Sequence, residues 1–318
     1  MKRKSPADPS CIFGPVPSRR LNVSLGIDLI PYKTCTLDCI YCESGKTTDL
    51  RVRRQRFVDP HRVLAEFKAY LDRVKYPLDY VTLSGSGEPT LSADLGTVIR
   101  GLKKTSSTPV AVLTNGTLLC DVRVQEELME ADLVIPSLDA VDPQVFARIN
   151  QPHPDLDLKR ILGGLEGFAH RYPGRLWVEV FLVRAVNDHP DHLDALRRFL
   201  QKIPRERVQL NSLDRPPAYR GTRSLTLGEL EKIRRDWRDL PVEIIKRADR
   251  REDIAAFCRN LENSILNTIR RRPMTLRDLE SFTGKEGDEL TRYLDLLGKD
   301  QKIEKRVIRG QVFFCARK

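Results

Sequence analysis

The feature that most constrains the fold is a regular alternation of short β-rich runs and helix-like segments between residue 23 and about residue 246. The strand-like runs are apolar along most of their length, as strands covered on both faces should be. The predicted strands span residues 23–30, 80–85, 110–114, 133–138, 176–183, 207–213 and 241–246. The predicted helices between them span residues 60–75, 92–104, 121–130, 157–171, 190–201 and 226–238.

Alternating β and α units predict an α/β protein with a parallel sheet and right-handed crossovers. The units observed here predict either a closed or partial β/α barrel or an open, doubly wound sheet. The chain has 318 residues, of which 40% are hydrophobic, so one large domain plus a small one is expected.

The pattern changes beyond about residue 255. A short helix is predicted at 265–272, Pro273 ends it, and two further helices are predicted within 274–284 and 285–301. The run that follows alternates around Arg309-Gly310, which predicts a β-hairpin. Three helices and a hairpin are the outline of a winged-helix domain. The expected division of the chain is a flexible N-terminal tail at 1–13, a β/α domain at 14–250 and a winged-helix-like domain at 257–318.

The net charge of +11 favours a polyanionic partner such as nucleic acid, although basic runs as short as residues 51–56 are equally typical of a solvated surface. The third C-terminal helix mixes acidic and basic side chains, so sequence-specific DNA reading is not predicted. No apolar run approaches the roughly 20 residues that span a membrane, and no apolar region follows the charged N-terminus. We therefore expect a cytoplasmic protein with no membrane contact.

Polar, glycine-rich segments follow the predicted strands at their C-terminal ends. SGSGEPT follows the second strand, TNG follows the third and DRPP follows the sixth. Because active sites of β/α barrels are built on that rim, we expect these segments to surround a functional site.

Three cysteines, Cys35, Cys39 and Cys42, lie in the stretch CTLDCIYC after the first strand. The chain has seven cysteines in all, an odd number with the other four scattered, which does not indicate a disulfide framework. A structural zinc site needs four ligands and a catalytic one needs three plus water, and the nearest histidine is His61. A cubane iron–sulfur cluster usually takes four thiolates, so three cysteines would leave one iron open to another ligand.

These residues resemble the motifs of radical S-adenosylmethionine (radical SAM) enzymes. CTLDCIYC carries the CxxxCxxC spacing with Tyr41 at the aromatic position, and SGSGEP and TNG resemble the glycine-rich and third-strand motifs. The likeness covers about residues 14–215. GPVPSRRLNVSLGIDLIPYKTCTLDCIYC and LNSLDRPP are most similar to the subgroup of wybutosine-synthesising tRNA enzymes and bacterial iron–sulfur oxidoreductases. The resemblance implies a partial (β/α)6 barrel of the TIM type.

The resemblance also implies residue roles. Cys35, Cys39 and Cys42 would ligate a 4Fe–4S cluster whose open iron is chelated by SAM. The Tyr41 backbone would meet the adenine, and the motif containing Glu88 would accept from the SAM ammonium. The implied SAM-contacting residues are Tyr41, Gly85, Gly87, Glu88, Asn115, Ser137, Asp139 and, more weakly, Asn187 and Asn211. Only Cys11 lies upstream of the motif, so a second cluster of the wybutosine type is not expected.

The implied reaction is reductive cleavage of SAM to a 5′-deoxyadenosyl radical, which abstracts hydrogen from a substrate. The leading substrate hypothesis is tRNA or another nucleic acid, with electrons from a reductase or a flavodoxin- or ferredoxin-type donor. The alternatives are modification of a peptide or small molecule, with the winged helix as a docking module, and an iron–sulfur redox sensor that binds nucleic acid. The GEP and TNG motifs argue against the sensor, which has no need of them.

Two charged residues have competing interpretations. Glu179 lies on an otherwise apolar strand, where it either points into the barrel or forms a structural salt bridge to a neighbouring strand. Arg215 of DRPP either reaches substrate or the SAM carboxylate, or is an exposed loop arginine.

Overall fold

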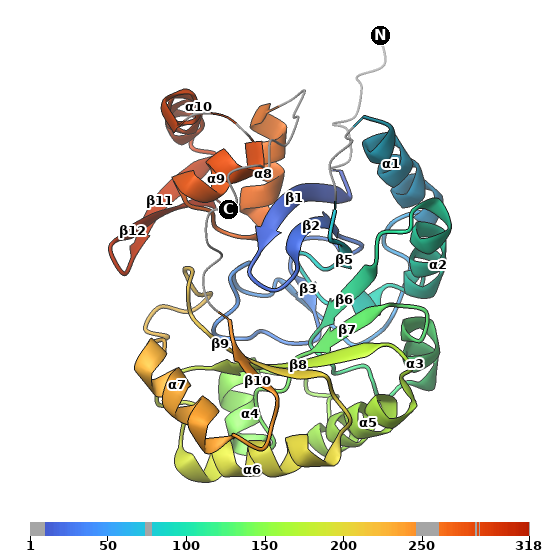
Figure 1. Cartoon of the computed structure of the whole chain (residues 1–318). Coiled ribbons are helices and arrows are strands. Elements are labelled where there is room, and N and C mark those ends of the chain that lie inside the picture. Colours follow the sequence, from blue (N-terminus) through green and yellow to red (C-terminus); the bar gives the residue numbers. More distant parts are fainter. Residues whose placement is uncertain (1–9, 74–77, 246–260, 284, 286, 318) are drawn as a thin grey trace.

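The computed structural model describes residues 10–73, 78–245, 261–283, 285 and 287–317. Its centre is an eight-stranded sheet in the order β1-β2-β5-β6-β7-β8-β9-β10 (Figure 1). Neighbouring strands are parallel except β1 and β2, which are antiparallel. The strands are β1 (Ile12–Ser18), β2 (Asn22–Ile27), β5 (Tyr80–Leu83), β6 (Val110–Thr114), β7 (Leu133–Pro136), β8 (Arg175–Leu182), β9 (Arg207–Ser212) and β10 (Val242–Ile244).

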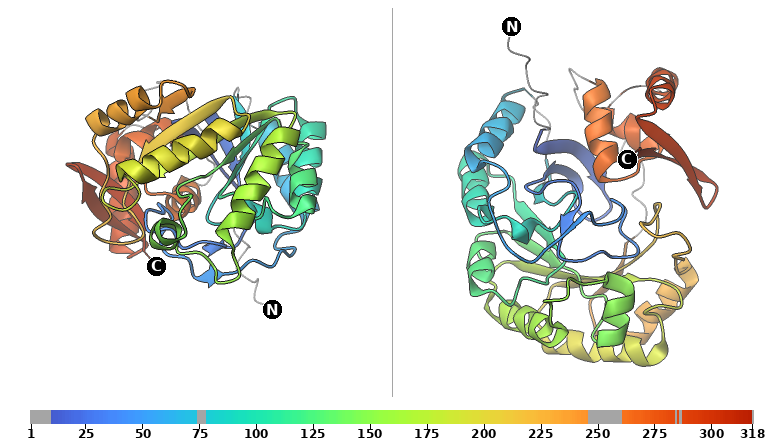
Figure 2. Two further views of the ribbon diagram at one scale, coloured as in Figure 1. Left: turned by 90° about the horizontal axis from the view of Figure 1, so that it is seen from below. Right: turned by 180° about the vertical axis from the view of Figure 1, so that it is seen from behind.

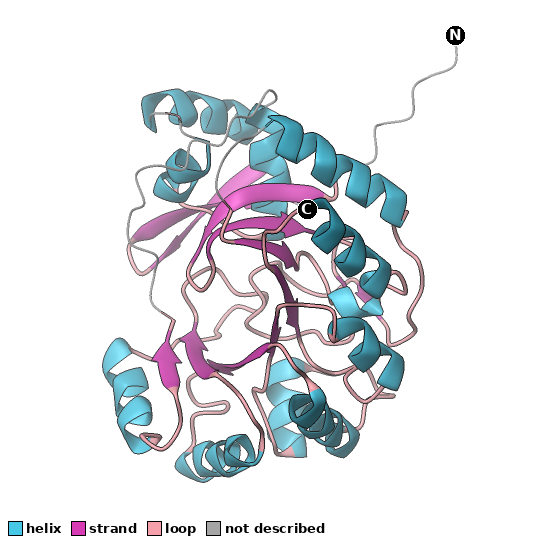
Figure 3. Cartoon of the chain, turned by 45° about the vertical axis from the view of Figure 1, so that its right-hand side comes forward, coloured by secondary structure: helices cyan, strands magenta, loops and turns pink. Residues whose placement is uncertain are grey.

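The sheet is curved but open, because β1 and β10 are its two edge strands. Figure 3 shows the strands in an arc with most of the helices outside it, while loops occupy the inside. The helices of this part are α1 (Pro60–Arg73), α2 (Leu95–Thr105), α3 (Val122–Leu128), α4 (Pro143–Asn150), α5 (Leu158–Arg171), α6 (Pro190–Lys202) and α7 (Leu227–Asp236). Amphipathic helix faces and the sheet share the main core; Val63 and Phe67 of α1, for example, are fully buried against it. The predicted α/β fold with a mostly parallel sheet is confirmed.

Among the longer elements of this part, β1 and α4 were not predicted from the sequence. β1 reads IFGPVPS, and its glycine and two prolines are signals of a loop, but an edge strand tolerates proline because one side needs no hydrogen bonds. It begins at Ile12, so residues 10–13, predicted to be tail, belong to the fold, while residues 1–9 lie outside the description. α4 begins with Asp142 as a side-chain N-cap and Pro143 in the first turn, a start signal that was present in the sequence.

The C-terminal module, residues 261–317, consists of α8 (Leu261–Arg271), α9 (Leu276–Thr283), α10 (Gly287–Lys299) and the hairpin β11 (Ile303–Ile308) and β12 (Gln311–Ala316). The turn residues Arg309 and Gly310 both have positive φ, as a two-residue hairpin turn requires. The order of helices and hairpin is the predicted one. The module has its own core, formed by Ile265, Leu266, Ile269, Met274, Leu279, Phe282, Leu290, Leu294, Leu297, Ile303 and Phe314.

The module lies against one edge of the sheet, where α8 and α9 contact β1 (Figure 2). The predicted domain boundary at residues 250–257 falls outside the described residues. Within the part of the chain that the structure describes, no helix is both long enough and apolar enough to cross a membrane.

Candidate active site

The cysteine loop lies at the C-terminal edge of the parallel strands. Cys35 ends the short strand β3 (Thr34–Cys35), which pairs with β4 (Asp49–Leu50). Further along the loop, the Ile40 amide donates to the carbonyl of Ile149 at 3.0 Å, at the end of α4. Leu37 is buried in a small core beneath the loop. The loop is therefore held by backbone bonds on both sides and by apolar packing below.

Each thiol of the loop receives one N–H donor from outside the CTLDCIYC stretch. Two donors are side-chain amides and the third is an ammonium. Asn150 and Lys33, the donors to Cys39 and Cys42, were not predicted from the sequence. The pairs are Asn115 Nδ2 to Cys35 Sγ at 3.5 Å, Asn150 Nδ2 to Cys39 Sγ at 3.3 Å and Lys33 Nζ to Cys42 Sγ at 3.1 Å.

Burial raises the pKa of Cys35 to about 11 and raises the pKa of Cys39 well above the ordinary thiol value. A bound metal would reverse this, because a coordinating thiol is deprotonated. Among the described residues, no three His, Cys, Asp or Glu side chains converge on one ion. In an iron–sulfur cluster each cysteine binds a different iron, so the three thiols need not converge on one ion. The donor set therefore fits a polynuclear iron–sulfur group.

Burial also acts on Lys33, whose side chain is only 2% exposed. Burial alone would lower its pKa, but the sulfurs of Cys42, Cys35 and Cys39 outweigh it and the pKa is raised. The Lys33 side chain thus lies buried beside the Cys42 thiol.

The glycine-rich loop 84–89 packs directly beneath the cysteine loop. A Cβ on Gly87 would lie 1.9 Å from the Thr34 carbonyl oxygen, and a Cβ on Gly85 would lie 2.2 Å from the carboxyl carbon of Asp28. Both glycines are required by these contacts within the protein. The sequence motif thus has a steric cause, in addition to any approach to a ligand.

Glu88, which follows these glycines, has a buried carboxylate whose oxygens accept hydrogen bonds from four donors within the protein. It caps the 3₁₀ helix η1 (Pro89–Leu91) and accepts from the Thr90 amide at 3.0 Å and the Thr90 hydroxyl at 2.6 Å. It also accepts from the Thr114 hydroxyl at 2.6 Å and the Asn115 amide at 2.7 Å. Burial raises the pKa of Glu88, and these four donors oppose that rise. The side chain joins the glycine-rich loop to the end of β6.

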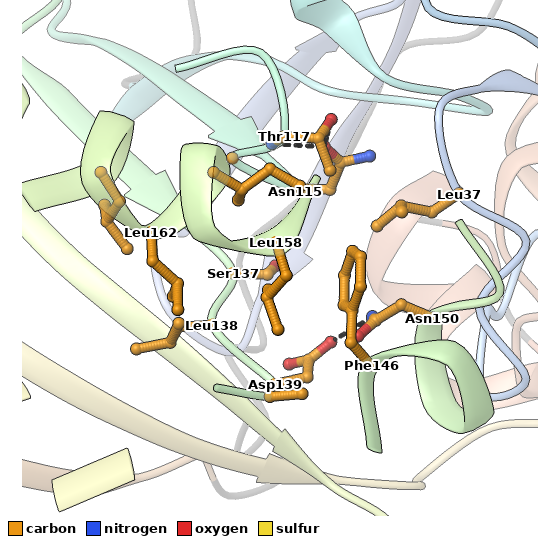
Figure 4. Close-up of a pocket in the computed structure, with 14 residues that line it drawn as sticks. Leu37, Asn115, Thr117, Ser137, Leu138, Asp139, Phe146, Asn150, Leu158 and Leu162 are labelled. Atoms are coloured by element: carbon orange, nitrogen blue, oxygen red, sulfur yellow. Dashed lines mark hydrogen bonds between the residues drawn. The ribbon is translucent and has the colours of Figure 1, made fainter. Parts of the chain in front are cut away.

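Three predicted SAM-contacting residues, Asn115, Ser137 and Asp139, line one small cavity (Figure 4). Its volume is about 20 Å³, room for a single water and not for SAM. Leu37 and Phe146 line the same cavity, so its walls are partly apolar. The structure thus brings these three predicted residues together under the cysteine loop.

Asp139 connects the cysteine loop to β8. Its carboxylate accepts from the Tyr41 hydroxyl, from Asn150 Nδ2 at 2.8 Å and from the Phe181 amide at 2.9 Å. The Tyr41 ring stacks on Phe181 with centroids 3.9 Å apart. Burial raises the pKa of Asp139 to about 6. The Tyr41 side chain is therefore fixed between Asp139 and Phe181.

The two weaker candidates do not line this cavity, and their side chains bind protein groups. Asn187, fully buried, donates to the carbonyls of Asp139 at 2.9 Å and Phe181 at 2.8 Å. Asn211 donates to Glu179 Oε1 at 2.7 Å. Glu179 also pairs with Arg20 in the β1–β2 turn, so the salt-bridge interpretation holds, but with a partner across the inside of the sheet.

The interpretation of Arg215 as an exposed loop arginine is wrong, and contact with substrate or the SAM carboxylate stays a prediction. The side chain is 4% exposed and belongs to the contact with the C-terminal module. It donates to the Pro273 carbonyl and to Asp278 Oδ2 at 3.2 Å, and it pairs with Glu43 of the cysteine loop at 3.5 Å.

A cysteine loop beside a glycine-rich loop, on the C-terminal edge of a curved parallel sheet, defines an iron–sulfur enzyme of the β/α-barrel class. The chain belongs to the radical SAM superfamily, whose sequence family matches residues 29–200. Members of this superfamily are enzymes that use a 4Fe–4S cluster and SAM, so the predicted family, enzyme class and cofactors are confirmed.

Several relatives match almost the whole chain. A UPF0026 protein of Helicobacter pylori (strain J99) is 32% identical over 307 residues, which cover 96% of this chain and 97% of the relative. A protein named GTPase Obg, of Brachyspira hyodysenteriae, is 32% identical over 317 residues, or 99% of this chain. The chain spans only 46% of that second relative.

Two solved structures share the fold. A radical SAM methyltransferase from Sphaerobacter thermophilus superposes with a TM-score of 0.56 at 17% identity, covering 74% of this chain and 69% of that one. The structure of TYW1 with a lysine–pyruvate adduct superposes with a TM-score of 0.52 at 19% identity, covering 71% of this chain and 76% of that one.

Proposed function

We propose that the chain binds a 4Fe–4S cluster through Cys35, Cys39 and Cys42 and uses it to modify a substrate by radical chemistry. The observation that carries the proposal is the donor set: three thiols on one loop, each with a side-chain N–H donor from outside the CTLDCIYC stretch. A cluster held by these cysteines would supply the electron for reductive cleavage of SAM to methionine and a 5′-deoxyadenosyl radical, and the substrate would lose a hydrogen atom to that radical. The protein contributes binding, orientation and exclusion of water.

We propose that SAM is held mostly by main-chain atoms of the loops beside the cysteines. The candidate side chains Glu88, Asn187 and Asn211 are already bonded within the protein, which supports a role in shaping these loops. Asn115 and Asp139 lie nearer the thiols, since each is bonded to a thiol or to a donor of one. The proposed SAM-contacting set is Tyr41, Gly85, Gly87, Glu88, Asn115, Ser137, Asp139, Asn187 and Asn211, in which Glu88, Asn187 and Asn211 would contribute main-chain atoms.

For the substrate, we propose tRNA or another nucleic acid, supported by the net charge of +11. The C-terminal module, which we propose to be a winged helix, would stand beside the site. Its basic hairpin is partly neutralised, because Lys302, Lys305 and Arg306 pair with acidic residues of the same module. This pairing favours a second candidate, a peptide or small molecule, with the module as a docking element.

Anaerobic reconstitution with iron and sulfide, followed by SAM and dithionite, tests the enzyme. We expect 5′-deoxyadenosine from the native protein and none from the triple variant Cys35→Ala, Cys39→Ala, Cys42→Ala. Cys120→Ala is the matched control, since Cys120 is exposed. Full iron loading of the triple variant would contradict the ligand assignment, and a loaded native protein that releases no 5′-deoxyadenosine would contradict the reaction.

The same preparation tests the partners. A flavodoxin- or ferredoxin-type donor should replace dithionite. RNA binding through phosphates should weaken steeply as salt rises, whereas a peptide or small-molecule substrate predicts no such RNA affinity.

A further inference from the structure

Lys33 is held in one conformation by the backbone around it. Its φ of 55° lies in the left-handed region, and its carbonyl accepts from the amides of Thr48 at 3.0 Å and Asp49 at 3.1 Å. The next residue, Thr34, is paired with Asp49 in the β3–β4 ladder. The direction in which the Lys33 side chain leaves the chain is therefore set by bonds on both sides.

That direction takes the ammonium to the thiols. Lys33 is 2% exposed, and Nζ donates to Cys42 Sγ at 3.1 Å. In the described part of the chain, no ion pair joins a carboxylate to Nζ, and Nζ donates its hydrogen bond to Cys42 Sγ. A buried ammonium is costly unless negative charge compensates it, and here the compensation must come from the sulfur ligands.

The other two thiols differ in this respect. Asn115 and Asn150, which donate to Cys35 and Cys39, are neutral amides. Only the donor to Cys42 is a cation, so the three sulfur positions are electrostatically unequal.

We propose that Lys33 is a positioning residue that raises the reduction potential of the cluster through its charge on Cys42. Reduction adds a negative charge to the cluster, so a fixed cation at hydrogen-bond distance stabilises the reduced state more than the oxidised state. Hydrogen bonds to the sulfurs and local charge are the means by which proteins set such potentials. The inference depends on the proposed function, because it requires the cluster to be bound by these three cysteines.

The test is a redox titration of the reconstituted protein, followed by electron paramagnetic resonance. Lys33→Met removes the charge and keeps the apolar stem, Lys33→Gln keeps an N–H donor without charge, and Lys33→Arg keeps the charge. At one fixed solution potential, we expect the ratio of reduced to oxidised cluster to fall about tenfold in the Lys33→Met and Lys33→Gln variants. For one electron, this corresponds to a reduction potential lower by about 59 mV. The Lys33→Arg variant should keep a ratio of reduced to oxidised cluster close to that of the native protein.

Lys46→Met is the matched control, because Lys46 lies four residues beyond Cys42 but is exposed, where solvent and salt screen its charge. The cluster of the Lys46→Met variant should have the same reduction potential as that of the native protein. Equal potentials for Lys33→Gln and Lys33→Arg in fully loaded proteins would overturn the proposal, and this pair decides the matter even if Lys33→Met binds little iron. Iron content is measured first: a native protein with no cluster at the three cysteines would refute the proposed function instead.

Discussion

Glu88 illustrates how one motif residue can act through the fold. Its oxygens accept four hydrogen bonds that join the glycine-rich loop, η1 and the end of β6. The Asn115 amide is one donor, and the side chain of Asn115 reaches Cys35. Two successive hydrogen bonds through Asn115 therefore link the Glu88 carboxylate to Cys35, a proposed cluster ligand.

Glu88→Gln should therefore destabilise the protein. The amide nitrogen would replace one acceptor oxygen and face buried donors, each of which costs about 1–3 kcal/mol when left without a partner. We expect the free energy of unfolding, measured by denaturant titration, to fall by about that amount. Glu126→Gln, at an exposed position of α3, should change it by less than about 0.5 kcal/mol. Equal losses in the two variants would contradict this role.

At the scale of elements, local sequence predicted most of the fold. Hydrophobic periodicity and helix-capping residues predicted seven strands and six helices near their observed positions. They could do so because burial on both faces and amphipathic periodicity are properties of neighbouring residues. The site was predicted less completely. CxxxCxxC is a local pattern, but Asn150 reaches Cys39 across 111 residues of sequence, a pairing that only the packing of α4 creates.

α9 shows how an element boundary and the module contact depend on one side chain. Asp278 Oδ2 accepts from the Thr275 amide at 2.9 Å at the helix N-terminus, and it pairs with Arg215 at 3.2 Å. Burial alone would raise the pKa of Asp278, but Arg215 and Arg272 outweigh it and hold the pKa at about 2. Because the folded-state pKa is lowered, the carboxylate stabilises the fold above its unfolded pKa, and this contribution is lost as the pH falls towards 2.

Asp278→Asn should therefore lower the free energy of unfolding at pH 7 by about 2–4 kcal/mol. The gap between variant and native protein should shrink as the pH falls from about 4 towards 2. Denaturant titrations across that range measure it. Asp295→Asn removes an exposed ion pair of α10, and we expect a change of at most about 1 kcal/mol. A gap for Asp278→Asn that is independent of pH would be incompatible with the ion pair as its source.

At the scale of the whole molecule, the C-terminal module is joined to the glycine-rich loop through the carboxylate of Asp28, in addition to its contact with the cysteine loop through Arg215. Arg271, at the end of α8, donates to Asp28 Oδ2 at 3.0 Å and to the Ser10 carbonyl at 3.0 Å. The same Asp28 oxygen accepts from the Ser86 amide at 3.0 Å and the Ser86 hydroxyl at 2.8 Å. The module thus reaches the glycine-rich loop through a buried ion pair.

Arg271→Met should loosen that loop and weaken SAM binding. Without Arg271, the buried Asp28 carboxylate loses its cation, and breaking a buried pair from one side costs about 3–5 kcal/mol. We expect faster amide hydrogen exchange at residues 84–90 and a dissociation constant for SAM raised about tenfold. Arg270→Met is the control, since Arg270 is the exposed neighbour on the same helix. If the amides of the glycine-rich loop exchange at the native rate in both variants, the module does not stabilise that loop. Its contribution to the reaction would then lie in binding the substrate.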